Sequence, residues 1–220
     1  YVNTHVNQEI TVEPGLYNAL SSIANAKNRS IYLAPVYAEY NRMFLCEDDG
    51  EASQYDPTRQ PELAAYIAEI SAFANDPQMI DVQLLGENRI QLQVAQAYLD
   101  FAQENGIEMF LDFSWMTNAF IADYIAQILI DNGFTRGYLA SYDGFTRNLC
   151  EADQSFGLNV FDKVGNDILL PATVEYAGGS SLVTLRDFPL SDADRWHYYA
   201  FQDGRIANLL IDPATGKETS

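Results

Sequence analysis

The stretch "TNAFIADYIAQILIDNGF", residues 117–134, carries the strongest helix signal in the chain. Thr117 can cap its first turn, and Gly133 suits the position just after its last turn. The helix leads directly into a strand signal, "RGYLASYD", at 136–143. Helix signals dominate before this point and strand signals dominate after it. We therefore predict an α+β fold with a mainly antiparallel sheet, a helix-rich first half and a strand-rich second half.

The first half of the chain alternates helical periodicity with one hairpin signal. Apolar residues recur at three- and four-residue steps after Pro14 and again after Pro61, as on the buried face of a helix. Turn residues at Gly86-Glu87-Asn88 separate two strand-like runs. The expected elements are helices over 14–27, 63–73 and 95–106, a hairpin over 79–94 and a strand over 107–114.

The second half reads as strands punctuated by Gly, Asp and Asn. We find no repeat, low-complexity tract or interdomain linker, so we treat residues 1–220 as a single domain with two lobes. The expected strands cover 157–164, 167–177, 181–188, 196–204 and 205–212.

Composition narrows the function classes. Hydrophobic residues make up 48% of the chain, which supplies a core, and the formal net charge is −19. Such a charge repels phosphate backbones and anionic lipid surfaces, so we expect no nucleic-acid partner. No apolar run is long enough to span a bilayer. Cys46 and Cys150 could form one disulfide or none, and their spacing fits no zinc motif.

Four segments occur in the order of a known family. They are "HVNQEITVEPGLYNAL" (5–20), "DFSWMTNAFIAD" (112–123), "GYLASYDG" (137–144) and "HYYAFQDGRIANLLIDPATG" (197–216). Together they resemble the ApbE-type FAD:protein FMN transferases, a mostly extracytoplasmic bacterial family. The resemblance implies an ApbE-like fold, here without the family's first strands and its C-terminal segment. It also implies an extracytoplasmic location.

The resemblance places flavin-binding positions at five residues, several of which depart from the family. They are Asp112, Trp115, Asn118, Asp143 and Gly144. Trp115 stands where the family has a glycine that lets the backbone approach the flavin. Asn118 replaces a lysine and Asp143 replaces a glycine, so a cation and a close approach are both lost.

The resemblance also places a magnesium site at the end of the chain. In the family, the aspartate and threonine of D-P-x-T-G help to hold Mg²⁺ against the FAD pyrophosphate, and here these are Asp212 and Thr215. The family's preceding histidine is Leu209. Its early F-D-P-T segment falls on 33–36, which has no carboxylate. Y-D-P-T at 55–58 resembles that segment, but it stands just before the second helix, where the family has ordinary connecting sequence. The alternative is that Asp212 and Thr215 only stabilise a proline-initiated turn, which is the interpretation we favour.

An aromatic run near the C-terminus has two interpretations. It consists of Trp196, Tyr198, Tyr199 and Phe201. The rings could stack on a flavin, or alternate along a strand and pack into the core, and we favour packing.

These observations lead to two function hypotheses. The first is an ApbE-like domain that has lost flavin transfer and has no catalytic residue. It would serve as a non-catalytic binding or structural module, with a protein partner and no cofactor. The alternative is a working magnesium-dependent transferase that moves FMN from FAD to a Ser or Thr hydroxyl of an acceptor protein. A partner-binding domain with no ligand at all cannot be separated from the first hypothesis by sequence.

Overall fold

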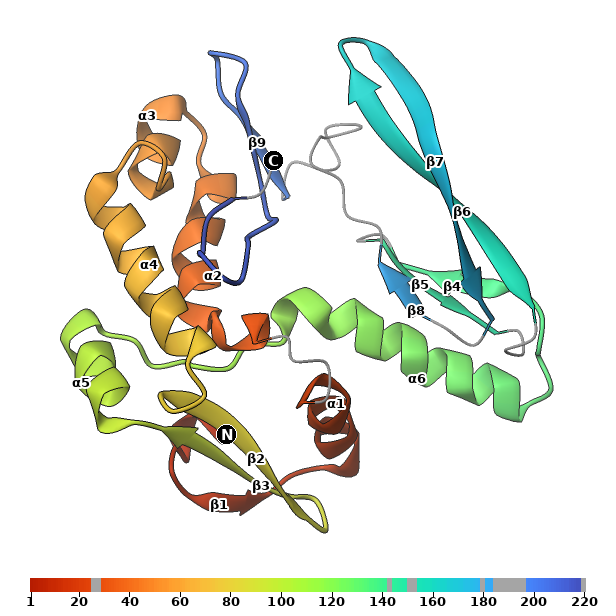
Figure 1. Cartoon of the computed structure of the whole chain (residues 1–220), viewed down its shortest axis with the longest axis horizontal. Coiled ribbons are helices and arrows are strands. Elements are labelled where there is room, and N and C mark those ends of the chain that lie inside the picture. The colour runs from red at the N-terminus through yellow and green to blue at the C-terminus, as the bar shows by residue number, and fades with distance from the viewer. Residues whose placement is uncertain (25–28, 142–143, 150–153, 179–180, 184–196, 219–220) are drawn as a thin grey trace. The chain divides into compact units, whose positions relative to one another are not determined.

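The computed structural model of the chain describes residues 1–24, 29–141, 144–149, 154–178, 181–183 and 197–218 (Figure 1). Within these residues the fold is α+β, with six α-helices and small antiparallel sheets. Helices lie mostly in the first half and strands in the second, as the sequence predicted. The chain forms two compact units: unit 1 comprises Tyr1–Phe113 and Pro189–Ser220, and unit 2 comprises Ser114–Phe188.

Unit 1 contains a three-stranded antiparallel sheet with the strand order β1-β3-β2. Its strands are β1 (Glu9–Thr11), β2 (Ile80–Gly86) and β3 (Arg89–Val94). The predicted hairpin is confirmed. Its turn residues Glu87 and Asn88 have φ values of 53° and 60°. Positive φ at both central residues matches the right-handed twist of the paired strands.

The helices of unit 1 follow the predicted periodicity where it was strong. They are α1 (Pro14–Ala24), α2 (Ala34–Tyr40), α3 (Asp49–Ala52), α4 (Pro61–Asn75) and α5 (Gln96–Asn105). Short 3₁₀ turns occur at η1 (Val2–Thr4), η2 (Ser30–Tyr32), η3 (Asn41–Leu45) and η4 (Ser53–Tyr55). Helix α1 is described to Ala24, and the rest of its predicted length lies outside the described residues. Helix α5 ends at Gly106, whose φ of 67° is the predicted left-handed cap.

The core of unit 1 lies on one face of this sheet. Alternate residues of β2 and β3 are buried, and α1 and α4 both pack against β2. The buried side chains include Ile80, Val82, Ile90, Leu92 and Val94 from the strands and Ile67 and Ile70 from α4. Each such side chain contributes about 1.5–3 kcal/mol relative to exposure.

The strand predicted over 107–114 is wrong. The segment is not part of a β-ladder. Instead, the Asn3 side chain accepts hydrogen bonds from the backbone N–H groups of Phe110 and Leu111, at 3.0 and 2.9 Å, and donates one to the Leu111 carbonyl at 2.8 Å. A single amide side chain therefore takes the place of a neighbouring strand.

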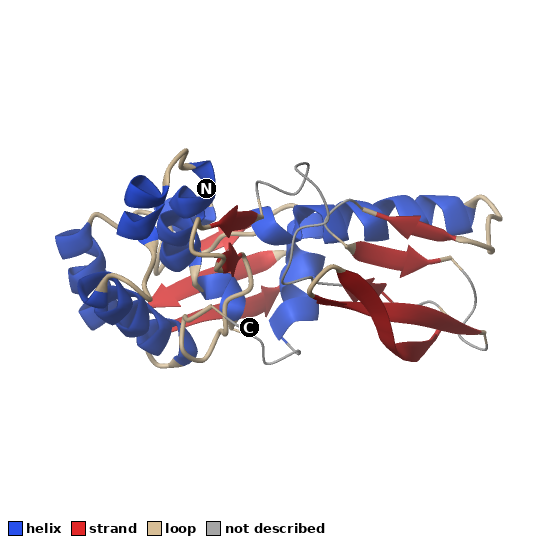
Figure 2. Cartoon of the chain, turned by 90° about the horizontal axis from the view of Figure 1, so that it is seen from above, coloured by secondary structure: helices blue, strands red, loops and turns tan. Residues whose placement is uncertain are grey.

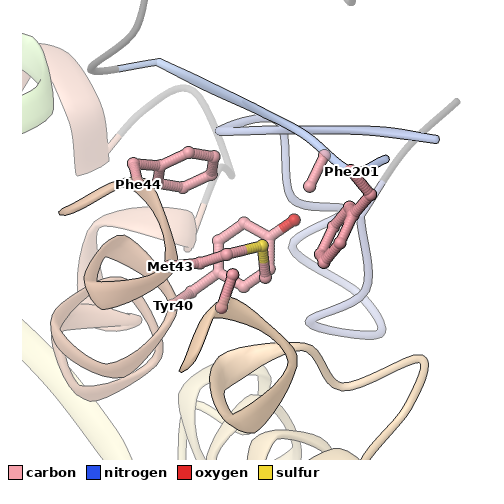
Figure 3. Close-up of a cluster of buried hydrophobic side chains, with 6 residues drawn as sticks. Tyr40, Met43, Phe44 and Phe201 are labelled. Atoms are coloured by element: carbon pink, nitrogen blue, oxygen red, sulfur yellow. The ribbon is translucent and has the colours of Figure 1, made fainter. Parts of the chain in front are cut away.

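A second apolar cluster joins α2 and η3 to the end of the chain. Strands β9 (Tyr198–Ala200) and β10 (Ile206–Asn208) pair antiparallel, and both are shorter than predicted. Figure 3 shows Tyr40 and Met43 between Phe44 and Phe201. All four are buried, as is Ala207. Helix α2 was not predicted, because its seven residues are too few to establish a helical period.

Unit 2 combines one long helix with two small sheets (Figure 2). Helix α6 (Thr117–Asp131) follows the turn η5 (Ser114–Met116), ends before Gly133 as predicted, and packs against two strands of the sheet β4-β5-β8. The strands of this sheet are β4 (Tyr138–Ala140), β5 (Phe145–Asn148) and β8 (Ser181–Val183). The other residues of the strand predicted over 181–188 lie outside the described residues.

The other sheet of unit 2 is a long two-stranded ribbon of β6 (Ser155–Val164) and β7 (Asp167–Ala177) (Figure 1). Both strands were predicted. Their register shifts so that two residues of β7, Leu170 and Pro171, lie opposite Phe161. Proline has no N–H to donate to a ladder, so it is found at such irregular positions.

No helix in the part of the chain that the structure describes is both long enough and apolar enough to cross a membrane.

Tyr98 provides a test of the core of unit 1. Its ring stacks on Phe73 with centroids 4.6 Å apart, but its buried hydroxyl has no hydrogen-bond partner among the described residues. We expect Tyr98→Phe to leave the free energy of unfolding at pH 7 unchanged or to raise it by up to about 1 kcal/mol, because an unsatisfied polar group is removed. Tyr98→Ala, by contrast, should cost about 3–5 kcal/mol. Urea unfolding measures both.

The same substitution should also change the alkaline limit of stability. Burial raises the pKa of Tyr98 above its usual range, so its contribution is complete below about pH 10 and is lost as the pH rises above that. Tyr98→Phe should therefore lose less stability than the wild type between pH 9 and pH 11. An equal loss in both proteins would contradict the assignment.

Candidate functional site

The D-P-A-T-G segment forms a turn that is closed by its own aspartate. The Asp212 carboxylate accepts hydrogen bonds from the Ala214 N–H and the Thr215 hydroxyl, both at 2.9 Å. The Asp212 carbonyl accepts two more, from the N–H groups of Thr215 at 3.2 Å and Gly216 at 2.7 Å. Each oxygen of the carboxylate is thus used inside the turn. This is the chemistry by which Asp stabilises a turn that proline has started.

The turn is the tip of a short hairpin, which we call the C-terminal hairpin and define as Ile211–Glu218. A bridge between Ile211 and Glu218 closes it, and the Asp212 N–H donates to the Lys217 carbonyl at 2.8 Å. The hairpin lies directly on α4. A Cβ at Gly216 would stand 2.2 Å from the Ser71 hydroxyl oxygen and 2.7 Å from a methyl carbon of Ile67. The Asn75 side chain of α4 also donates to the Pro213 carbonyl.

A buried carboxylate lies near the base of this hairpin, at Asp56 of the Y-D-P-T segment. Its side chain is 1% exposed. One oxygen accepts from the Thr58 N–H at 2.9 Å and the Thr58 hydroxyl at 2.6 Å. The other oxygen contacts the guanidinium groups of Arg59, at 3.3 Å, and Arg205. Asp56 therefore joins the segment before α4 to the segment before β10.

The two arginines extend this contact into a network. Arg59 also pairs with Asp203, and Arg205 pairs with Glu218 at 3.3 Å. Both guanidinium carbons lie over the buried ring of Phe201, at 4.4 and 4.2 Å from its centroid. Cation–π contacts of this kind are worth more when the cation is partly desolvated. We call Asp56, Arg59, Asp203, Arg205 and Glu218, together with the ring of Phe201, the arginine–carboxylate network.

Glu218 is the member of the network with the least favourable environment for a charge. Its side chain is 14% exposed, and burial raises the pKa of its carboxyl above the ordinary value. The Asn208 N–H, which donates to it at 2.7 Å, and Arg205 both oppose the rise. The Tyr40 hydroxyl lies beside the same carboxylate, and burial first, then Glu218 and Asp56, raise the pKa of Tyr40.

The structure distributes the predicted site residues over both units. Asp212 and Thr215 are in direct contact, as a metal site would require. Asp112 belongs to another part of unit 1, where its N–H donates to the Ile31 carbonyl at 3.4 Å. Asn118 and Gly144 belong to unit 2. Asp143 and the side chain of Trp115 lie outside the described residues.

The described residues offer few ligands for a magnesium ion. Among them, no group of three or more His, Cys, Asp or Glu side chains could hold a metal. Asp212 directs both oxygens into its own turn, and Thr215 donates its proton to Asp212. Mg²⁺ prefers an octahedral shell of hard oxygens, and one carboxylate and one hydroxyl leave most of it unfilled. These contacts agree with the turn interpretation.

The aromatic run contributes to packing. Tyr198 and Phe201 are buried. The ring of Tyr199 meets that of Phe201 edge-on, with centroids 4.7 Å apart, and its hydroxyl donates to Asp49 at 3.2 Å. Trp196 lies outside the described residues. For the three described rings, these contacts support the packing interpretation.

Sequence reasoning missed the partners of Asp56. Y-D-P-T at 55–58 was noted as a substitute carboxylate, but its pairing with Arg205 was not foreseen. The two residues are 149 positions apart, and no local pattern links them. Cys46 is a free thiol, whereas Cys150 lies outside the described residues.

Comparison with known proteins returned no relatives. No protein-family model matches the sequence, no curated protein is significantly similar to it, and no solved structure matches the fold.

Gly216→Ala tests the docking of the C-terminal hairpin on α4. We expect a loss of about 2–4 kcal/mol, because the new methyl group overlaps Ser71 and Ile67 and the φ of 66° is unfavourable for alanine. Gly106→Ala is the matched control, since its φ is 67° but nothing lies within 4 Å of the new Cβ. Gly106→Ala should lower the free energy of unfolding by only about 1–2 kcal/mol, which is the cost of a left-handed backbone conformation at alanine. Equal losses in urea unfolding would rule out the close approach.

Asp56→Asn tests the arginine–carboxylate network. We expect it to lower the free energy of unfolding by about 3–5 kcal/mol, because two partly buried guanidinium groups lose their shared partner. Asp203→Asn removes the exposed partner of Arg59 and should change stability little. Chemical denaturation of both variants at pH 7 gives the comparison, and the network is not important for stability if the two losses are alike.

Proposed function

We propose that the chain is an ApbE-like domain that no longer transfers flavin and serves as a non-catalytic binding or structural module. The observation that carries the proposal is the Asp212 carboxylate, whose two oxygens both accept hydrogen bonds within their own turn. A catalytic metal ligand would direct its lone pairs toward the ion and the substrate phosphates. The D-P-A-T-G segment is the best-preserved part of the resemblance, and the hydrogen bonds of its turn account for Asp212 and Thr215 without a metal ion.

The substitutions at neighbouring positions support the same proposal. Leu209, which stands where the family has a histidine, packs against the apolar cluster around Tyr40 and Phe201. An imidazole that could contact a phosphate or a metal is thus replaced by a side chain that stabilises the core. Trp115 and Asn118 replace the glycine and lysine that would receive a flavin and its pyrophosphate. Each change removes a contact that the transfer reaction needs.

The resemblance also bears on location and partners. We propose an extracytoplasmic bacterial setting and a protein partner, without flavin or magnesium. The net charge of −19 favours a partner with a basic surface, since opposite charges accelerate encounter.

The direct test is incubation of the whole chain with FAD, Mg²⁺ and an acceptor flavoprotein domain. We expect no covalent yellow product in a denaturing gel, and no quenching of FAD fluorescence on titration. An active ApbE-type transferase serves as the positive control. Product formed at a rate near that of the control would establish the alternative, a working FMN transferase.

Asp212→Asn separates the structural role of this residue from a catalytic one. Its amide NH₂ cannot accept the hydrogen bond of Thr215, so we expect a loss of about 1 kcal/mol of stability. Affinity for Mg²⁺, followed by isothermal titration calorimetry, should be negligible in both the wild type and the variant. Specific binding by the wild type alone would identify Asp212 as a metal ligand.

A further inference from the structure

The arginine–carboxylate network has unequal numbers of charges. Its ion pairs join three carboxylates, those of Asp56, Asp203 and Glu218, to the two guanidinium groups of Arg59 and Arg205. One negative charge is therefore in excess when all five groups are ionised. Arg205 divides its side chain between Asp56 and Glu218, so these two carboxylates compete for one cation.

The surroundings of the three carboxylates determine which of them takes up a proton first. Asp56 accepts hydrogen bonds from the Thr58 N–H, the Thr58 hydroxyl and Arg205, and it forms a second ion pair with Arg59. Asp203 is exposed, and the Arg205 N–H and Arg59 lower its pKa. Glu218 has fewer donors, is largely buried, and faces Asp56 as well as Arg205, Tyr40 and the Asn208 N–H. We therefore assign to Glu218 the proton that neutralises the excess negative charge.

Glu218 also closes the C-terminal hairpin. It pairs with Ile211 across the hairpin, and its carboxylate contacts Arg205 and the N–H of Asn208 in β10. The other end of the hairpin is the Asp212–Gly216 turn on α4. A change of charge at Glu218 thus acts at the base of the segment that holds the turn in place.

We propose that Asp56, Arg205 and Glu218 form a proton-sensitive latch, in which uptake of one proton at mildly acidic pH fastens the C-terminal hairpin to the rest of unit 1. Protonation removes the excess charge, leaves Arg205 to Asp56, and lets Glu218 remain in its buried position as a neutral carboxylic acid. At higher pH the Asp56 and Glu218 carboxylates are both ionised and repel each other. The C-terminal hairpin is then held less firmly, because Glu218 lies at its base.

The direction of the effect follows from linkage. The pKa of Glu218 is higher in the folded protein than in the unfolded chain, so the folded state binds the proton more tightly. The contribution of Glu218 to stability therefore declines as the pH rises from the pKa of glutamate in the unfolded chain, about 4.3, through the pKa in the folded protein. Asp203, whose pKa is lowered, has the opposite effect, and only at more acidic pH.

The first experiment compares the melting temperature of the wild type and Glu218→Gln between pH 5 and pH 8. On going from pH 8 to pH 5, the melting temperature of the wild type should gain ~3 °C relative to that of Glu218→Gln, because the glutamine side chain is neutral at both pH values. Glu69→Gln is the matched control, because Glu69 is exposed on α4 and its removal changes the net charge equally. Its pH profile should follow the wild type. Identical profiles for the two variants would overturn the proposal.

The second experiment uses the wild type alone and does not depend on the folding of a variant. In a ¹³C NMR titration, the Glu218 carboxyl should titrate at a higher pH than a glutamate in an unfolded chain, which titrates at about 4.3. Hydrogen exchange of the Gly216 and Lys217 amides, corrected for intrinsic rates, should be slower at pH 5.5 than at pH 7.5, by up to about tenfold. A Glu218 midpoint at or below that unfolded-chain value, or equal protection at both pH values, would contradict the latch.

Discussion

The contact between Asp56 and Arg205 joins two parts of unit 1 that are far apart in the sequence. One part precedes unit 2 in the sequence, and the other part, which contains β9, β10 and the C-terminal hairpin, follows it. A buried ion pair adds little net stability, because desolvation offsets attraction. Its contribution here is positional: the pair with Asp56 holds Arg205 where it also contacts Phe201 and Glu218.

Apolar packing supplies most of the stability around this contact. Phe201 lies in one buried cluster with Tyr40, Met43 and Phe44 (Figure 3), to which Ala207 also belongs. The guanidinium groups of Arg59 and Arg205 lie over the Phe201 ring. The flat faces of the arginines remain in apolar surroundings while their N–H groups reach the carboxylates. The faces of each guanidinium group thus make the apolar contacts, and its edges make the polar ones.

Local signals accounted for the elements whose pattern spans several turns or pairs. The periodicity of 63–73, the Glu87-Asn88 turn and the Gly106 cap each depend on residues close in sequence, and each was confirmed. The strand over 107–114 was wrong because its apolar pattern says nothing of the Asn3 amide that satisfies its backbone. Helix α2 was missed for lack of length. The resemblance pointed to Asp212 and Thr215, but not to the residues that surround them.

Sequence alone determined the α+β class, the positions of the longer helices and strands, and the D-P-A-T-G turn, since propensity, periodicity and turn chemistry act over a few neighbouring residues. Tertiary structure decided how the carboxylates are used. Asp212 closes its own turn, Asp56 is buried between two arginines, and Glu218 is held at the base of the hairpin. The reason is physical: the state of a carboxylate depends on burial and on charges brought near by folding, and neither is written in its sequence neighbours.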